Sequence, residues 1–281
     1  MLIGNKNCDK CGSSYDIARD TCPACNAPNQ EKKSMKSIKA ILFLPPEKQL
    51  VLVLIGFGAL QIIGYLLGAV LDNFLSESDV LYHVIINVVC YTSIAIGMSL
   101  LIFKDFKLFG RHLSKPIPYV AGLTGGIILI MVTLTYSFLL TLWLPIFNIT
   151  REVNANQALA NNMMVRFPIT SILVIGILGP ICEEFTYRLG MYSFLRRINK
   201  YLAYAVTIIF FAVIHIDFFS TDIVSELIAL PQYIFAGFTF CLLYEKWGIG
   251  ASVTAHITNN LFSVFLTILQ QILLMINGTS S

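Results

Sequence analysis

Two adjacent carboxylates and an arginine interrupt a long apolar stretch, in the segment ICEEFTYR at residues 181–188. A charged side chain at the centre of a membrane helix costs about 2.5–3.5 kcal/mol on insertion scales, so residues retained there usually serve a function. Glu184 and Arg188 stand at i,i+4 with the acid N-terminal, the order that favours a helical ion pair. Glu183 is rotated by about 100° from Glu184 and has no such partner on its own helix. We therefore expect Glu183 to be the carboxylate that is left to act as a general base.

Three further polar residues lie on later apolar segments. His215 follows the polar turn RRINKY by the same 16 residues by which Glu183 precedes it, counted from residue 199. At 1.5 Å per residue, each lies about 24 Å of helix from the turn, so the two can face each other across an antiparallel pair. His256 and Asn260 are again at i,i+4 and share one face of the last segment. We predict that polar groups from three helices meet inside the membrane.

The composition predicts the elements that would carry these residues. Of 281 residues, 56% are hydrophobic and 12% are charged, whereas soluble domains have about 25% charged residues. We expect an all-α polytopic membrane protein with about seven or eight transmembrane helices, in contact with the lipid bilayer. The net charge of +3 is small, and the basic residues are clustered in a few loops, as in membrane proteins, so no nucleic-acid partner is expected. The long apolar segments cover residues 50–72, 79–103, 117–147, 168–198, 201–217, 224–244 and 248–276, of which the fifth is short for a span.

Basic residues are concentrated before the first segment and after the second and fourth segments. The alternate connections DNFLSESD and DFFSTDIVSE contain neither lysine nor arginine. Because cytoplasmic loops carry the excess of positive charge, this pattern predicts a cytoplasmic N-terminus. With seven spans, the C-terminus would lie outside.

A separate cysteine module precedes the membrane segments. Residues 1–30 hold two C-x2-C pairs, formed by Cys8 with Cys11 and by Cys22 with Cys25. Four thiolates at this spacing are typical of a closed structural zinc site, and so short a segment needs the metal in order to fold. Two disulfides are the alternative, but a cytoplasmic N-terminus favours zinc. We expect a zinc-ribbon-like module that docks a cytosolic protein or stabilises the chain. A basic amphipathic linker would occupy residues 31–49 and precede a membrane domain at 50–281.

Three short motifs resemble a known family. EEFTYR matches EExxxR at 183–188, FAVIH matches FxxxH at 211–215, and HITNN matches HxxxN at 256–260. In this order on separate apolar segments, they resemble the CPBP intramembrane proteases (Abi proteins), relatives of the type II CAAX prenyl endopeptidase. The resemblance covers about 117–276 and departs at Leu189, where a glycine is frequent, and in helix number, since prototypes have eight helices. It implies an integral protein of a prokaryotic cell membrane.

The same resemblance assigns a role to each polar residue. Glu183 and His215 would activate water for attack on a peptide bond of a membrane-associated protein or an apolar peptide. His256 and Asn260 would stabilise the oxyanion, while Glu184 and Arg188 would orient the site. A carboxylate with two histidines also resembles the His2Glu set of zinc enzymes. We favour a site without a catalytic metal, because donors at i,i+4 suit an oxyanion hole.

Two other functions remain open at the level of the sequence. The first is a non-catalytic membrane protein of the bacteriocin self-immunity type, which would act by binding and retain the polar residues only for helix packing. The second is a proton-coupled transporter, since intramembrane glutamate and histidine also mark proton relays. Paired broken helices in repeated halves would favour the transporter, and the sequence shows no such repeat.

Overall fold

The computed structural model describes residues 5–16, 19–29, 44–150 and 152–277. The chain divides into two compact units, residues 1–43 and residues 44–281, which are described separately below. Most of the predicted linker at 31–49 lies outside the described residues. Its last residues belong to the membrane unit, because the first helix among the described residues begins at Pro46 and not at residue 50 as expected. Proline is well suited to the first helical position, because an N–H there would have no hydrogen-bond partner within the helix.

The N-terminal unit is a small hairpin followed by a second turn. Strands β1 (Asn5–Asn7) and β2 (Ser14–Asp16) pair antiparallel, with Lys6 opposite Tyr15. Each C-x2-C segment closes with a backbone bond to the carbonyl of its first cysteine, from Gly12 to Cys8 at 2.8 Å and from Asn26 to Cys22 at 2.9 Å. Both donors have a left-handed backbone, with φ of 73° and 54°, which glycine and asparagine adopt readily.

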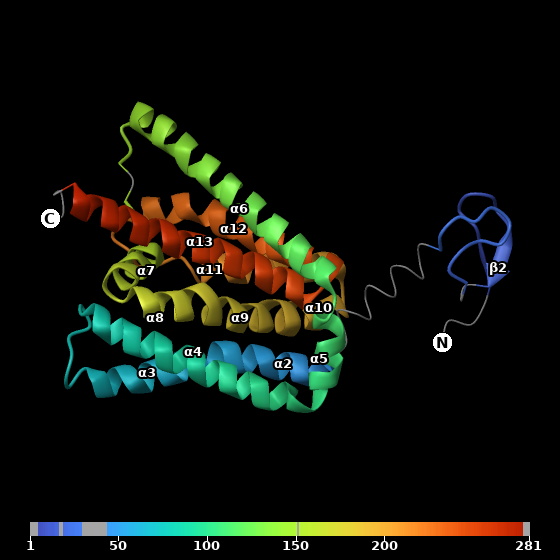
Figure 1. The fold of residues 1–281 in the computed structure, drawn as a ribbon, viewed down its shortest axis with the longest axis horizontal. Coiled ribbons are helices and arrows are strands. Elements are labelled where there is room, and N and C mark those ends of the chain that lie inside the picture. Colours follow the sequence, from blue (N-terminus) through green and yellow to red (C-terminus); the bar gives the residue numbers. More distant parts are fainter. Residues whose placement is uncertain (1–4, 17–18, 30–43, 151, 278–281) are drawn as a thin grey trace. The chain divides into compact units, whose positions relative to one another are not determined.

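Each apolar segment predicted from the sequence forms a helix over most of its length, although α11 (Lys200–Val213) leaves residues 214–217 of the fifth segment outside it. Six of the resulting helices are long and apolar enough to cross a membrane. The seventh, α11, is shorter, as its sequence indicated. The described part of this unit is therefore an all-α polytopic membrane protein (Figure 1). Its principal helices are α2 (Pro46–Leu54) and α3 (Leu60–Leu71), joined by a π-helical stretch, then α4 (Val80–Ile102), α6 (Pro116–Trp143), α11 (Lys200–Val213), α12 (Ile223–Trp247) and α13 (Ile249–Ile276).

Two connections that the sequence indicated only as loops contain helices. They are α5 (Phe106–Leu113) and α7 (Ala155–Arg166). The Asn154 side chain caps α7 by accepting a bond from the backbone N–H of Gln157 at 3.4 Å. Helix α7 packs against α4, α8 and α13, which places it beside the polar residues considered below.

The helix that carries Glu183 is irregular. It consists of α8 (Pro168–Leu173), a π-helical stretch at Val174–Leu178, α9 (Gly179–Glu184), a second π-helical stretch at Phe185–Tyr192, and α10 (Ser193–Arg196). Pro180 lacks an N–H, and its ring conflicts with a regular turn before it, which accounts for the first widening. Such widened turns are frequent at functional sites. Here they flank the two adjacent glutamates.

Helix α6 crosses α13 closely near one end and then diverges from it (Figure 1). A Cβ atom added to Gly122 would lie 2.5 Å from the Ala251 carbonyl oxygen, and one added to Gly126 would lie 2.9 Å from that of Ala255. Glycines and alanines four residues apart allow two helix backbones to approach in this way. Beyond Gly126 the facing residues of α6 are larger, and the helices separate.

Candidate functional site

Glu184 and Arg188 form the ion pair that their spacing predicts. The Arg188 Nη1 atom donates to Glu184 Oε1 at 2.9 Å, and both side chains are fully buried. The Arg188 Nη2 atom donates to the Gly237 carbonyl at 3.3 Å, and the guanidinium carbon lies 4.7 Å from the centre of the Phe211 ring. Pairing and cation–π contact together reduce the cost of a buried charge.

Glu184 also binds the last helix. Its Oε1 atom lies 2.9 Å from His256 Nδ1, and its Oε2 atom accepts a bond from the Ser252 hydroxyl. A carboxylate only accepts hydrogen bonds, so it holds the His256 ring with Nδ1 as the donor. The Nε2 atom then faces Glu183, whose Oε2 atom is 3.9 Å away.

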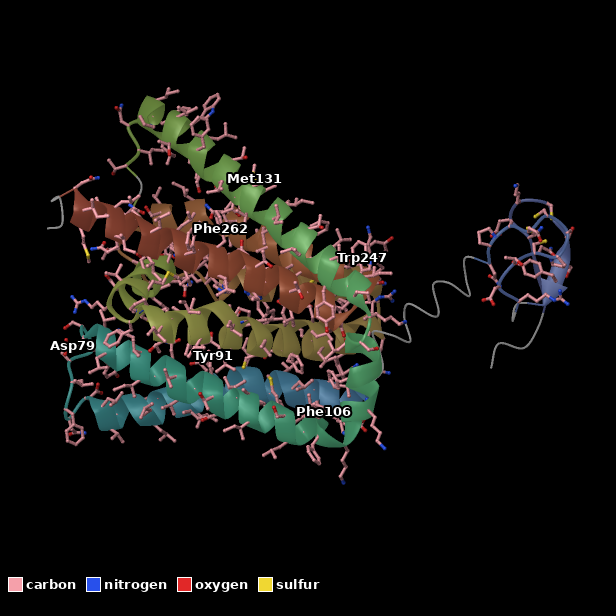
Figure 2. The ribbon with its side chains drawn as sticks, viewed as in Figure 1. Asp79, Tyr91, Phe106, Met131, Trp247 and Phe262 are labelled. Atoms are coloured by element: carbon pink, nitrogen blue, oxygen red, sulfur yellow. The ribbon has the colours of Figure 1, made fainter. Side chains whose placement is uncertain are left out.

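Glu183 is the less constrained of the two carboxylates. The Tyr91 hydroxyl on α4 donates to its Oε1 atom at 3.2 Å, from the edge of that helix next to α9 (Figure 2). Its Oε2 atom is buried and has no hydrogen-bond partner in the described part of the chain. A buried acceptor without a partner is costly in free energy and calls for a functional explanation.

His215 lies just beyond the end of α11 in a defined orientation. Its Nδ1 atom is 2.6 Å from the Phe211 carbonyl oxygen, and its ring stacks on Tyr233 with centroids 4.5 Å apart. A carbonyl can only accept, so Nδ1 carries the proton and Nε2 keeps its lone pair. That tautomer can accept a proton at Nε2.

Glu183, His215 and Asn260 line two adjoining cavities of about 140 Å³ each. His256 lines the first of these cavities. One N–H of the Asn260 amide bonds the Ile175 carbonyl at 3.0 Å, which leaves the second N–H of the same group for another acceptor. The structure thus brings together the four residues that the sequence singled out, on α9, α13 and the segment after α11.

A second buried carboxylate, Glu226 on α12, was missed by the sequence reasoning. It is 1% exposed and accepts bonds from the Ala155 N–H at 2.7 Å, the Asp217 N–H at 3.1 Å and the Asn154 side chain at 3.4 Å. Asn154 also donates to the His215 carbonyl at 3.1 Å. Glu226 therefore ties the start of α7 to the segment that carries His215. In the sequence, Glu226 is a single acid near the polar start of an apolar segment, and such a position does not by itself predict a structural role.

The four N-terminal cysteines form a cluster whose sulfur atoms all lie within 4.8 Å of one another. The Cys8–Cys25 and Cys11–Cys22 sulfur distances are 3.5 and 3.7 Å, close to the edge of about 3.8 Å in a tetrahedron with 2.3 Å metal–sulfur bonds. Hydrogen bonding to Ser13 lowers the pKa of Cys11 to about 6. The Ala27 backbone lowers the pKa of Cys25, but the bond with Cys11 and burial outweigh this and raise it to about 12. The four sulfur atoms are close enough together to bind a single tetrahedrally coordinated cation.

Comparison with known families locates a match over this site. Residues 165–262 match the family model described as type II CAAX prenyl endopeptidase Rce1-like. This segment is similar to the Rce1-like family. It runs from the end of α7 into α13 and includes all three motifs, which confirms the resemblance inferred from them. The Rce1-like match indicates a peptidase and assigns no role to an individual residue. No curated protein and no solved structure matches the chain.

Proposed function

We propose that this protein is an intramembrane endopeptidase that hydrolyses a peptide bond of a membrane-associated or apolar peptide substrate. One observation carries the proposal: the buried Glu183 Oε2 atom has no partner among the described residues, lies at a cavity shared with His215 and Asn260, and is 3.9 Å from His256 Nε2. A free carboxylate can serve as the general base, and the imidazoles and amide beside it can hold water and stabilise an oxyanion, so this arrangement suits peptide hydrolysis. The Rce1-like match supports the same reaction class.

In the proposed reaction, Glu183 and the Nε2 atom of His215 hold a water molecule and remove a proton from it. The water oxygen forms a C–O bond with the substrate carbonyl carbon, and a tetrahedral oxyanion results. The C–N bond then breaks, and the proton taken from water passes to the leaving nitrogen. The products are a carboxylate end and an amine end, and no redox partner is needed.

The remaining polar residues stabilise and position this reaction. In the proposal the His256 ring carries a proton on both nitrogens: Nδ1 donates to Glu184, and Nε2 donates to the oxyanion together with the second amide N–H of Asn260. A low dielectric in the site strengthens such bonds. Glu184 holds the His256 ring, and Arg188 compensates the Glu184 charge. Glu183 and its neighbours act without a catalytic metal.

The N-terminal module holds a structural zinc at Cys8, Cys11, Cys22 and Cys25 in this proposal. The distances between its sulfur atoms support a tetrahedral cation. The module lies in the cytoplasm of a prokaryotic cell, as the lysine and arginine pattern of the loops indicates, and contacts a cytosolic protein.

The deciding experiment compares N-terminal peptide proteomics of membranes that contain the wild-type protein or Glu183→Gln at matched expression. New chain ends found only with the wild type are expected, and their flanking residues identify the substrate. Identical profiles from two folded proteins, under conditions in which the substrate is made, would instead support a non-catalytic binding role of the immunity type.

A further inference from the structure

A groove adjoins the proposed catalytic cavity on the side of α6. It has a volume of about 200 Å³ and lies between α6, α12 and α13, with Leu129 and Leu134 on α6 and Phe262 on α13 among its lining residues. Leu134 and Leu266 at its border are 45% and 38% exposed. In a membrane helix such exposure means contact with lipid, so the groove opens sideways towards the bilayer.

The groove and the cavity share a wall. Gln157, Tyr233, Ala236, Asn259 and Ser263 line both spaces. The groove exists because α6 and α13 meet closely at Gly122 and Gly126 and then separate where α6 carries larger residues. No charged side chain of the described residues lines the groove, and the shared wall places it directly beside the cavity that Glu183 and His215 line.

Side-chain amides give the groove a specific polarity. The Gln232 Nε2 atom is buried and has no hydrogen-bond partner in the part of the chain that the structure describes, although its residue lines the groove. Gln157 and Asn259 present further amides at the shared wall. A lipid chain would satisfy none of these groups, whereas an extended peptide offers a carbonyl and an N–H at each residue.

We propose that this groove receives an uncharged, extended segment of the polypeptide substrate from the bilayer, and that Gln232 donates to one of its main-chain carbonyls. That the bound peptide is then cleaved rests on the proposed function. An extended peptide in the membrane loses its intrahelical hydrogen bonds, and each unsatisfied group is costly. The amides of the groove can bond the main-chain groups of the peptide and so offset this cost. The groove therefore favours peptide segments whose side chains are apolar and whose main-chain groups are free to form these bonds.

Photo-crosslinking tests occupancy of the groove without requiring cleavage. A photoreactive phenylalanine analogue is placed at Leu134 in the full-length Glu183→Gln protein, reconstituted in nanodiscs with a blocked synthetic peptide of alanine, leucine and valine. Phe138 on the same helix is 62% exposed, does not line the groove and serves as the matched position. Labelling of the peptide from position 134 and not from 138 supports the inference. Equal labelling from both positions, or labelling of lipid alone, overturns it.

The second measurement isolates the Gln232 amide. In the same nanodiscs, Gln232→Leu is expected to weaken peptide binding by about two- to tenfold, the value of one neutral hydrogen bond. Gln61→Leu, at an exposed glutamine of α3, is expected to leave binding unchanged. Unaltered affinity in Gln232→Leu would overturn the role assigned to this residue.

The two proposals can fail separately. If the membrane proteomes match but position 134 still labels the peptide, the groove is a peptide site on a non-catalytic protein. If Glu183-dependent chain ends exist but the groove labels only lipid, the peptidase stands and its substrate enters elsewhere.

Discussion

Glu184 and His256 lie 72 positions apart in the chain, and their Oε1 and Nδ1 atoms are 2.9 Å apart, with both side chains buried. This bond connects the irregular helix at 168–196 with α13 and sets the direction of the imidazole. The first of the adjacent glutamates remains available for chemistry while the second organises the site. The adjacent Glu183 and Glu184 therefore have different surroundings, because successive residues of a helix are rotated by about 100° around its axis.

Removal of one member of the Glu184–Arg188 pair is expected to destabilise the protein strongly. Glu184→Leu or Arg188→Leu leaves a buried uncompensated charge, at a cost of about 3–5 kcal/mol in the free energy of unfolding. The double variant removes both charges and is expected to lose less than the sum of the two single losses. Thermal unfolding of the three variants in the same detergent measures this coupling. Strict additivity would show that the pair is not a stabilising unit.

Glu183→Gln is expected to abolish cleavage with little change in stability. The Oε2 atom has no partner to lose, whereas loss of a general base typically costs about 10²–10⁴-fold in rate. Tyr91→Phe, which removes the hydroxyl 3.2 Å from Oε1, is the milder companion and is expected to reduce the rate only severalfold. Cleavage rates on a peptide that spans an identified chain end, together with melting temperatures, provide the measurement. Full activity of folded Glu183→Gln would assign the base to another residue.

Glu226→Gln is expected to loosen the segment that carries His215. Glutamine has only one side-chain oxygen, so its NH2 group would replace the acceptor of either the Ala155 or the Asp217 N–H. Leaving one buried donor without an acceptor costs about 1–3 kcal/mol in the free energy of unfolding. Hydrogen exchange should accelerate at residues 152–157 and 215–217, and kcat should fall. Glu77→Gln changes an exposed acid in the same way and is the matched control. Unchanged exchange in both segments would argue against the clamp.

Zinc removal is expected to unfold the N-terminal module and to spare hydrolysis. Cys22→Ser removes one of four ligands and should lower bound zinc from about one equivalent towards none, as measured by metal analysis of the purified protein. The peptidase rate of full-length protein should resist chelation, because the proposed site uses no metal. Loss of activity on chelation in wild type and in Cys22→Ser alike would point to a catalytic metal instead.

The N-terminus of α12 is expected to impose an acid-side pH dependence. Bonds from the Ser225 side chain and backbone lower the pKa of Asp222 below its ordinary 3.8. A lowered carboxyl pKa stabilises the fold above that ordinary value, and the contribution disappears as the pH falls through the folded-state pKa. Between neutral pH and about pH 3, wild type should therefore lose more thermal stability than Asp222→Asn, which caps the helix without titrating. Equal losses would exclude a contribution from this residue.

The apolar segments and the Glu184–Arg188 pair followed from the sequence because both depend on local properties. Segment length and the i,i+4 spacing act within one helix, and equal distances from one turn placed Glu183 and His215 at matching heights. The paired C-x2-C spacing similarly determined the cysteine cluster. The sequence did not predict helices α5 and α7, because they are short and lie in the loops between apolar segments.

Only the tertiary structure decided which partners surround these residues. The Tyr91–Glu183, Ser252–Glu184 and Asn154–Glu226 contacts join residues 68 to 92 positions apart. They depend on the rotation and tilt of whole helices, which hydrophobic periodicity along one segment does not specify. The groove beside α6 has the same origin, since the close crossing at Gly122 and Gly126 exists only when α13 presents Ala251 and Ala255 to it.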